Sequence, residues 1–213
     1  MAVLGHVDSG KTSLLDKIRG TGVQGREAGG ITQHIGASFL PDETIQKLCG
    51  ALYDKLGKTE NKVPGILVID TPGHEVFTNL RARGGSAADI AILVVDINRG
   101  FQPQTNESLK ILESRKVPFV VALNKVDMIS GWQQSDDAYI SQAIKKQSPS
   151  IQTNIDEQIY NVVGALSILG YQSEAFYRVQ DFKKEISIVP VSARSGVGTV
   201  SYTHLPLPTK RIV

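Results

Sequence analysis

Gly5-His6-Val7-Asp8-Ser9-Gly10-Lys11-Thr12 fits the pattern of a glycine, four residues and then Gly-Lys-Thr, and this stretch decides the fold. Its two glycines allow a tight turn, so that successive backbone N–H groups from about Asp8 to Thr12 point into one concavity at a helix N-terminus. Lys11 is expected to reach the β- and γ-phosphates of a nucleotide, and the Thr12 hydroxyl to ligate a magnesium ion that bridges them. Apolar residues before the stretch and a helical run after it supply the strand and helix that such a loop needs.

Apolar runs further along the chain predict a parallel sheet. Four of them are continuously apolar and rich in β-branched residues, as in strands buried on both faces: residues 65–69, 90–95, 119–123 and 186–191. Helical periodicity lies between them at residues 75–83, 104–116 and 151–169. This alternation predicts an α/β fold with a doubly wound, mostly parallel sheet, the three-layer αβα arrangement of P-loop NTPases. Residues 36–40 are expected to form an antiparallel strand at or near one edge.

The chain is expected to be one domain over residues 1–199, with two insertions. The first insertion covers residues 41–64 and contains a helix over about 42–56. The second covers residues 130–182 and opens with a polar stretch at 132–150 around Trp132. The apolar face of the long helix within it is formed by Ile151, Ile155, Ile159, Val162, Val163, Leu166 and Leu169.

Composition and the absence of a long apolar run indicate a soluble, cytoplasmic protein without a membrane segment, and we expect this protein to be a monomer. The 213 residues are 41% hydrophobic, which suits one α/β domain. Lys210 and Arg211 supply the whole net charge of +2, so bulk charge gives no argument for a nucleic-acid surface. The single cysteine, Cys49, forms no internal disulfide, which fits a reducing cytosol. No apolar run approaches the length of about 18 residues expected of a membrane-spanning helix.

Polar clusters follow three of the predicted strands. They are Asp70-Thr71-Pro72-Gly73-His74, Asn124-Lys125-Val126-Asp127 and Ser192-Ala193. In an open α/β sheet the ligand lies beyond the carboxyl ends of the strands, so these clusters and the phosphate loop are expected to meet in one crevice.

The second cluster predicts that the base is guanine. The Asp127 carboxylate can accept both the N1–H and the 2-amino protons of guanine, whereas adenine offers an acceptor at N1 and has no 2-amino group. The aliphatic stem of Lys125 is expected to lie over the base, and backbone N–H groups near Ser192 and Ala193 to meet guanine O6. The predicted ligand is therefore GTP or GDP. The candidate nucleotide-binding residues are Asp8, Ser9, Gly10, Lys11, Thr12, Ser13, Gly73, Asn124, Lys125, Asp127, Ser192, Ala193 and Arg194.

Residues near the third phosphate predict a switch and a hydrolytic centre. Asp70 is expected to hold Mg²⁺ through water, and the Gly73 N–H to face the γ-phosphate. Thr32, in the glycine-rich loop at 26–36, completes the magnesium shell only when that phosphate is bound, which would order the loop. His74 stands where other GTPases carry a glutamine that orients the attacking water.

For two other histidines and for two arginines, the sequence gives no argument for a catalytic role. His6 and His34 are expected to be structural, with contact at a surface or partner as the alternative. Arg81 and Arg83 could contact RNA or form a solvated helix face.

The motifs GHVDSGKT, GGITQHIGA, DTPGHEVF, NKVD and VSAR, over residues 2–199, together resemble those of the translational GTPases. GGITQHIGA is similar to the corresponding segment of translation initiation factor 2 and of its archaeal and eukaryotic form, initiation factor 5B. The two insertions favour the archaeal or eukaryotic form. The resemblance implies a ribosome-dependent GTPase that promotes subunit joining, with large-subunit RNA pressing His74 into place. It also implies that Val7 and Ile31 form an apolar gate beside His74, that Asp8 helps to hold a monovalent cation, and that initiator tRNA is reached only through further domains.

The sequence departs from the family at three places. Ser9 replaces the histidine or threonine of many relatives, which a position that contributes mainly backbone should tolerate. The chain starts almost on its first strand. After Gly198 the family continues into a closing helix, whereas residues 201–213 contain Pro206 and Pro208, so residues 200–213 are expected to be a non-native tail without regular structure.

Two other functions remain open. One is another translational GTPase, either elongation-type or initiator-tRNA-carrying, which shares GHVD, DxPGH and NKxD but departs from GGITQHIGA. The other is a nucleotide-gated ribosome-binding module with vestigial hydrolysis, against which the presence of His74 and Thr32 argues.

Overall fold

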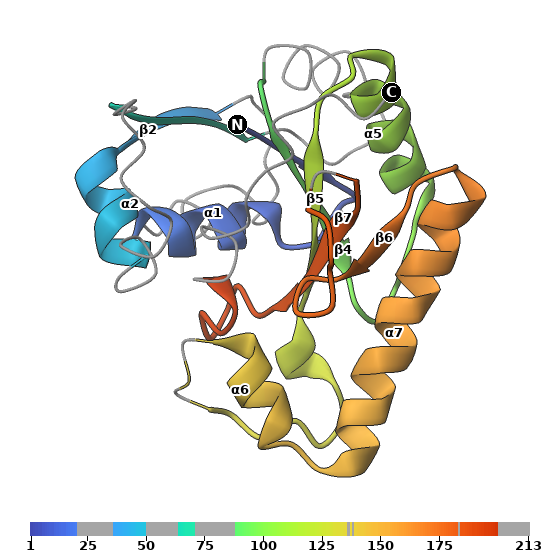
Figure 1. Ribbon diagram of the computed structural model, residues 1–213. Coiled ribbons are helices and arrows are strands. Elements are labelled where there is room, and N and C mark those ends of the chain that lie inside the picture. The colour runs from blue at the N-terminus through green and yellow to red at the C-terminus, as the bar shows by residue number, and fades with distance from the viewer. Residues whose placement is uncertain are drawn as a thin grey trace.

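A computed structural model shows seven strands in one sheet, in the order β2-β3-β1-β4-β5-β7-β6 (Figure 1). It describes residues 1–20, 36–49, 64–70, 88–135, 137, 139–182 and 184–199. The strands are β1 (Ala2–Gly5), β2 (Gly36–Pro41), β3 (Gly65–Asp70), β4 (Ala91–Asp96), β5 (Phe119–Asn124), β6 (Ser173–Ala175) and β7 (Ile186–Val191).

The strand pairings confirm the predicted sheet. β2 runs antiparallel to β3 at one edge, and the pairings of β1 with β3 and β4, of β4 with β5, and of β7 with β5 and β6 are parallel. Every residue of β4, β5 and β7 is buried, as three of the four unbroken apolar runs predicted, and β1 is buried as well. The prediction of burial on both faces was wrong for β3, in which only Val68 and Asp70 are buried and Leu67 is 52% exposed. β3 has only the antiparallel strand β2 beyond it at that edge of the sheet. Asp96 is level with Asn124 in the register, and Asn124 with Val191, so the carboxyl ends of three strands lie side by side.

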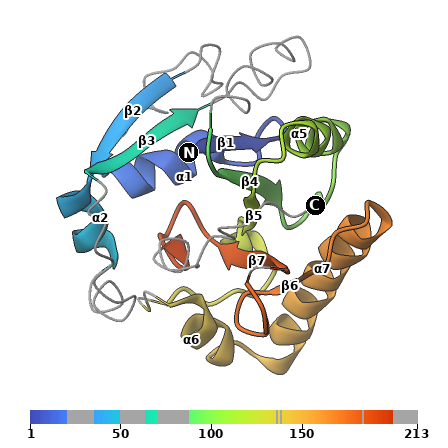
Figure 2. The same ribbon diagram turned by 45° about the horizontal axis from the view of Figure 1, so that its top comes forward.

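Helices cover both faces of the sheet. Figure 2 shows α1 (Lys11–Arg19) and α2 (Asp42–Cys49) on one face, and α5 (Pro103–Ser114) and α7 (Pro149–Ile168) on the other. α1 contacts β1 and β3, and α5 contacts β1 and β4. The resulting three layers confirm the predicted αβα architecture of a P-loop NTPase.

The long helix α7 begins at Pro149, where proline is favoured because the first helical N–H has no intrahelical partner. Five of the seven predicted apolar positions are buried, and Val163 is partly buried against the core. The prediction was wrong for Leu169, which is 44% exposed. The helix ends at Ile168, so Leu169 lies beyond the helix and is not part of its apolar face.

The second insertion contains two elements that the sequence did not predict. The polar stretch includes α6 (Ile140–Lys145), in which Ile140 and Ala143 are fully buried. β6 is three residues long and adds a parallel strand to β7. Both elements are too short to show a clear periodicity.

Several predictions lie outside the described residues. They concern the helices beyond residue 49 and at 75–83, the loop at 26–35 and the tail at 200–213. Within the part of the chain that the structure describes, no helix has the length and apolar character needed to cross a bilayer.

Candidate functional site

The loop between β1 and α1 requires its glycines for steric reasons. A Cβ atom on Gly5 would lie 2.3 Å from the Val94 carbonyl oxygen, and one on Gly10 would lie 2.2 Å from Asn124 Nδ2. Gly10 has φ of 90° and is the residue before α1, and Asp8 also has a positive φ, of 60°. The loop therefore turns sharply and directs the N-terminus of α1 to the carboxyl end of the sheet, an arrangement that suits an anion.

Lys11 is buried within this loop. Its side-chain Nζ donates a hydrogen bond of 2.7 Å to the backbone oxygen of His6, five residues earlier. The residue is only 6% exposed. The ammonium group is thus held over the loop, where a phosphate oxygen would meet it.

Thr12 and Asp70 bring two oxygen atoms together from neighbouring segments. The Thr12 hydroxyl donates to Asp70 Oδ2 over 3.2 Å, and both residues are buried. Hard oxygen ligands of this kind are those that Mg²⁺ prefers, and a site with few protein ligands leaves room for phosphate oxygens and water. The pair therefore fits the predicted magnesium site, while Thr32 lies outside the described residues.

Asn124 connects the phosphate loop to the segment after β7. Its Nδ2 donates to the Ser9 carbonyl oxygen over 2.8 Å, and its Oδ1 accepts the Ala193 N–H over 2.9 Å. The side chain is almost fully buried, at 1% exposed. Asn124 thus fixes two loops relative to each other, and Ser9 takes part through its backbone, as expected.

The other residues predicted to recognise the base follow β5 in a tight turn. Lys125 has φ of 72° and precedes a 3₁₀ turn, η4 (Val126–Met128). Its Nζ lies 2.8 Å from Asp96 Oδ2. Asp127 lies within this turn, just after the carboxyl end of β5, and is partly exposed. The contact between Lys125 and a base stays a prediction.

Residues 192–198 form a closed turn after β7. The Ser192 N–H donates to the Val197 oxygen over 2.9 Å, and the Gly196 N–H to the Ser192 oxygen over 2.8 Å. Arg194 is exposed. Because the Ser192 and Ala193 amides already donate within the protein, a contact with guanine O6 would be shared with these bonds, and it stays a prediction.

His6 is buried, which supports the structural expectation over a surface contact. It is 2% exposed, and its Nδ1 lies 3.5 Å from the Thr105 hydroxyl at the start of α5. Burial, followed by the positive charge of Lys11, lowers the pKa of His6 to about 4, and Asp96 partly opposes this shift. The imidazole is therefore neutral near pH 7.

For three other predicted site residues the structure gives the position and the burial, and five more lie outside the residues that it describes. Val7 is partly buried, Asp8 is exposed beside the loop, and Ser13 is partly buried in the first turn of α1. Ile31, Thr32, His34, Gly73 and His74 lie outside the described residues. The apolar gate, the monovalent cation near Asp8 and the catalytic histidine therefore stay predictions.

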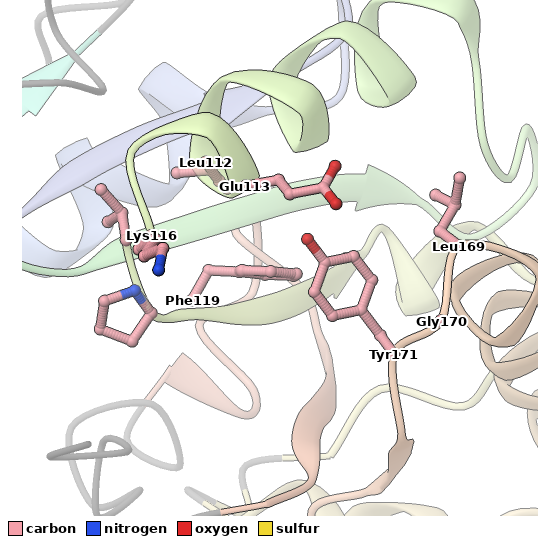
Figure 3. A pocket seen from close by; sticks show the side chains of 9 residues that line it. Leu112, Glu113, Lys116, Phe119, Leu169, Gly170 and Tyr171 are labelled. Atoms are coloured by element: carbon pink, nitrogen blue, oxygen red, sulfur yellow. The ribbon is translucent and has the colours of Figure 1, made fainter. Parts of the chain in front are cut away.

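A cavity of about 320 Å³ lies at the opposite ends of the strands (Figure 3). It adjoins Phe119, the first residue of β5. The residues predicted to bind the nucleotide lie at the other end of the strand, at and after Asn124, roughly 17 Å away. The Phe119 and Tyr171 rings pack edge to face with centroids 5.5 Å apart. Burial raises the pKa of Tyr171, and the Glu113 carboxylate, toward which its hydroxyl points, adds to the shift. This cavity is separate from the site described above.

Known proteins resemble this chain over almost its whole length. It is 56% identical over 198 residues to a protein of Thermococcus onnurineus and 54% identical to one of Methanopyrus kandleri, both named "Probable translation initiation factor IF-2". Each match covers 93% of this chain and 33% of the relative, so the chain spans about a third of these relatives.

Solved structures agree with this resemblance. The crystal structure of GDP-bound aIF5B from Aeropyrum pernix matches with a TM-score of 0.78 and 51% identity, over 95% of this chain and 34% of that one. Bacterial selenocysteine-specific elongation factor EF-Sec, at 23% identity and a TM-score of 0.61, shares the fold. The predicted resemblance to the initiation factor 2 and 5B group is confirmed.

The family model of the elongation factor Tu GTP binding domain matches residues 1–205. Since that match spans nearly the whole chain, the chain belongs to the elongation factor Tu GTP binding domain family.

Proposed function

We propose that this chain is the GTP-binding and GTP-hydrolysing domain of a translation initiation factor that promotes joining of the ribosomal subunits. The observation that carries the proposal is Asn124, which bonds at once to the phosphate loop and to the segment after β7. These bonds bring the residues predicted to hold phosphates and those predicted to hold guanine into one site. The names of the initiation factor relatives, and the GDP held by the Aeropyrum pernix protein, support the same function.

Recognition of guanine is assigned to Asp127. Its carboxylate would accept two hydrogen bonds from the Watson–Crick edge of guanine, each worth about 1.5–3 kcal/mol as a bond to a charged group. Adenine presents an acceptor at N1, which would lie against the same carboxylate without a hydrogen bond. The site should therefore reject ATP.

The phosphates would bind to the N-terminal amides of α1 and to the Lys11 ammonium. Thr12 and Asp70 would hold Mg²⁺ with Thr32, and the ion when bound would offset the negative charge of the β- and γ-phosphates. The Lys11 ammonium would exchange its bond with the His6 oxygen for one with a phosphate oxygen. For Lys11, binding of the phosphate would therefore require only one internal hydrogen bond, to the His6 oxygen, to break.

Hydrolysis is assigned to His74. Its imidazole would orient a water molecule that attacks the γ-phosphorus while the bond to the β-phosphate oxygen breaks, which yields GDP and phosphate. Val7 and Ile31 would form the apolar gate beside it. Large-subunit ribosomal RNA would position His74, so that turnover is stimulated by the ribosome. Initiator tRNA would contact only further domains of the whole factor, which acts in the cytoplasm as a monomer.

Competition binding tests the nucleotide assignment. Fluorescent GDP bound to the chain should be displaced by unlabelled GDP and GTP and should remain bound at equimolar ATP. Asp127→Asn should shift the preference toward xanthine nucleotides, whose 2-oxo group can accept from the new amide. Displacement of GDP by equimolar ATP would contradict the assignment.

Phosphate release tests the hydrolytic assignment and separates it from the vestigial alternative. In the full-length factor, ribosomes should stimulate release, and His74→Ala should remove most of the stimulation with little change in GTP affinity, because the residue acts in the transition state. Stimulation in this reaction class reaches about 10³- to 10⁵-fold. Stimulated turnover that survives His74→Ala would place the catalytic role elsewhere.

A further inference from the structure

Asp96 is a buried carboxylate at the carboxyl end of β4, and none of the motifs above includes it. It is 3% exposed. One oxygen, Oδ2, lies 2.8 Å from Lys125 Nζ, and the other, Oδ1, accepts the Asn98 N–H over 2.9 Å. The register of β4 and β5 places Asp96 level with Asn124, directly before the lysine. Both carboxylate oxygens therefore have partners, one of them a residue of the proposed base site.

Stabilisation of the fold alone does not account for the ion pair between Asp96 and Lys125. Removing a carboxylate and an ammonium from water costs free energy that their attraction often fails to recover, so a buried pair is weak evidence of stabilisation. The Lys125 side chain is 24% exposed, whereas that of Asp96 is 4% exposed. The carboxylate is thus the fixed partner, and the ammonium reaches it from the rim of the site.

The pair limits where the lysine stem can lie. Lys125 has a left-handed backbone with φ of 72°, set by the turn that starts η4, and its Nζ is held 2.8 Å from Asp96. With both ends of the side chain fixed, the four-carbon stem between them has few remaining rotamers. A free lysine would lose that rotamer freedom only when the ligand binds, which weakens binding.

We propose that Asp96 is a positioning residue for guanine nucleotides, because it holds Lys125 in the orientation in which its stem covers the face of the base. The inference rests on the proposed function, since it concerns the same site. A lysine ordered in advance adds affinity without a new contact to the ligand. Immobilising one such side chain on binding weakens affinity by roughly 2- to 12-fold, which sets the size of the expected effect.

The sign of the effect separates positioning from general electrostatics. Asp96 also acts electrostatically on His6, as do Lys11 and Lys125, so its charge lies close to the phosphate loop. Removal of a negative charge there would on its own strengthen the binding of any polyanion. Positioning requires the opposite result, weaker binding of GDP.

The test is a double-mutant cycle read out by the dissociation constant of GDP. Asp96→Asn keeps an oxygen that can accept the Asn98 N–H and removes the charge that holds the lysine. It should weaken GDP binding by roughly 2- to 12-fold in the wild-type background. In a Lys125→Met background, which has no ammonium to position, it should leave GDP binding unchanged or make it tighter. Asp89→Asn, an exposed acid before the opposite end of β4, is the matched control and should bind GDP as the wild type does.

Each outcome decides the inference. An equal loss in both backgrounds would assign Asp96 to the turn at Asn98 alone, and unchanged or tighter GDP binding by Asp96→Asn in the wild-type background would also overturn positioning. If Asp96→Asn does not fold, Asp96→Glu, which keeps the charge but moves it by one methylene, completes the same cycle. A wild-type chain that binds no GDP would instead overturn the proposed function.

Discussion

Asn124 satisfies two buried backbone groups from different loops with one side chain. Asn124→Ala would leave the Ser9 oxygen and the Ala193 N–H without this partner, and each unsatisfied buried group costs about 1–3 kcal/mol. For the two groups together, we expect the free energy of unfolding to fall by roughly 2–6 kcal/mol, measured by urea denaturation.

The control for this variant is Asn161→Ala, because Asn161 lies on the exposed surface of α7. A surface substitution of this kind should change the free energy of unfolding by no more than about 0.5 kcal/mol. Similar values for the two variants would show that Asn124 does not hold the loops together.

His6 should make the fold sensitive to acid. Its pKa is lowered to about 4 in the folded chain from an ordinary value of 6.5, so the unfolded chain takes up a proton first as the pH falls. The stabilisation is complete above pH 6.5 and is lost as the pH falls toward 4, with about 2 kcal/mol lost by pH 5.

Two measurements check the His6 prediction. An NMR titration of the imidazole should give a pKa well below 6.5. Urea denaturation at pH 7 and pH 5 should show a smaller loss of stability for His6→Gln, which does not titrate, than for the wild type. Equal losses would refute a role for His6 in the acid sensitivity.

At the scale of elements, α7 offers two isoleucines with opposite environments. Ile155 is fully buried, and Ile168, the last residue of the helix, is 86% exposed. Ile155→Ala should lower the free energy of unfolding by about 2–5 kcal/mol, because it removes buried methyl groups and leaves a cavity. Ile168→Ala is the matched control and should have an effect of no more than about 0.5 kcal/mol in the same denaturation experiment.

The elements also show what the sequence can predict. The central strands were predicted within one residue of their bounds, because continuous apolar runs are typical of strands buried on both faces. α6 and β6 were missed because six and three residues are too few for a periodic pattern. Their positions depend on tertiary contacts, such as the burial of Ile140 and the pairing of β6 with β7.

The same distinction applies to the candidate site. The phosphate loop and the NKVD segment were found from local spacing alone. Asp96 was not found, because its partner is 29 residues away and only the register of β4 and β5 brings them together. Burial of His6 likewise depends on α5, nearly 100 residues later in the chain.

At the scale of the whole molecule, nucleotide should stabilise the fold. The proposed site would combine Asp70 at the end of β3 with the segments after β1, β5 and β7, so the nucleotide would bind only when the sheet is assembled. GDP at about 100 times its dissociation constant should raise the free energy of unfolding by about 2.7 kcal/mol, and ATP at the same concentration should leave it unchanged. Thermal unfolding with each nucleotide measures this, and equal stabilisation by both would contradict selective binding.

The hydrogen bond between Ala193 and Asn124 has a consequence for hydrogen exchange. Amides inside a β-sheet exchange with deuterated water when strands separate, whereas the Ala193 N–H is protected by a side chain just beyond β7. The rate of deuterium uptake at Ala193 therefore reports how often its hydrogen bond with Asn124 Oδ1 breaks, separately from the opening of the sheet. Exchange at this single amide would measure how often the phosphate loop and the segment after β7 separate while the sheet stays intact.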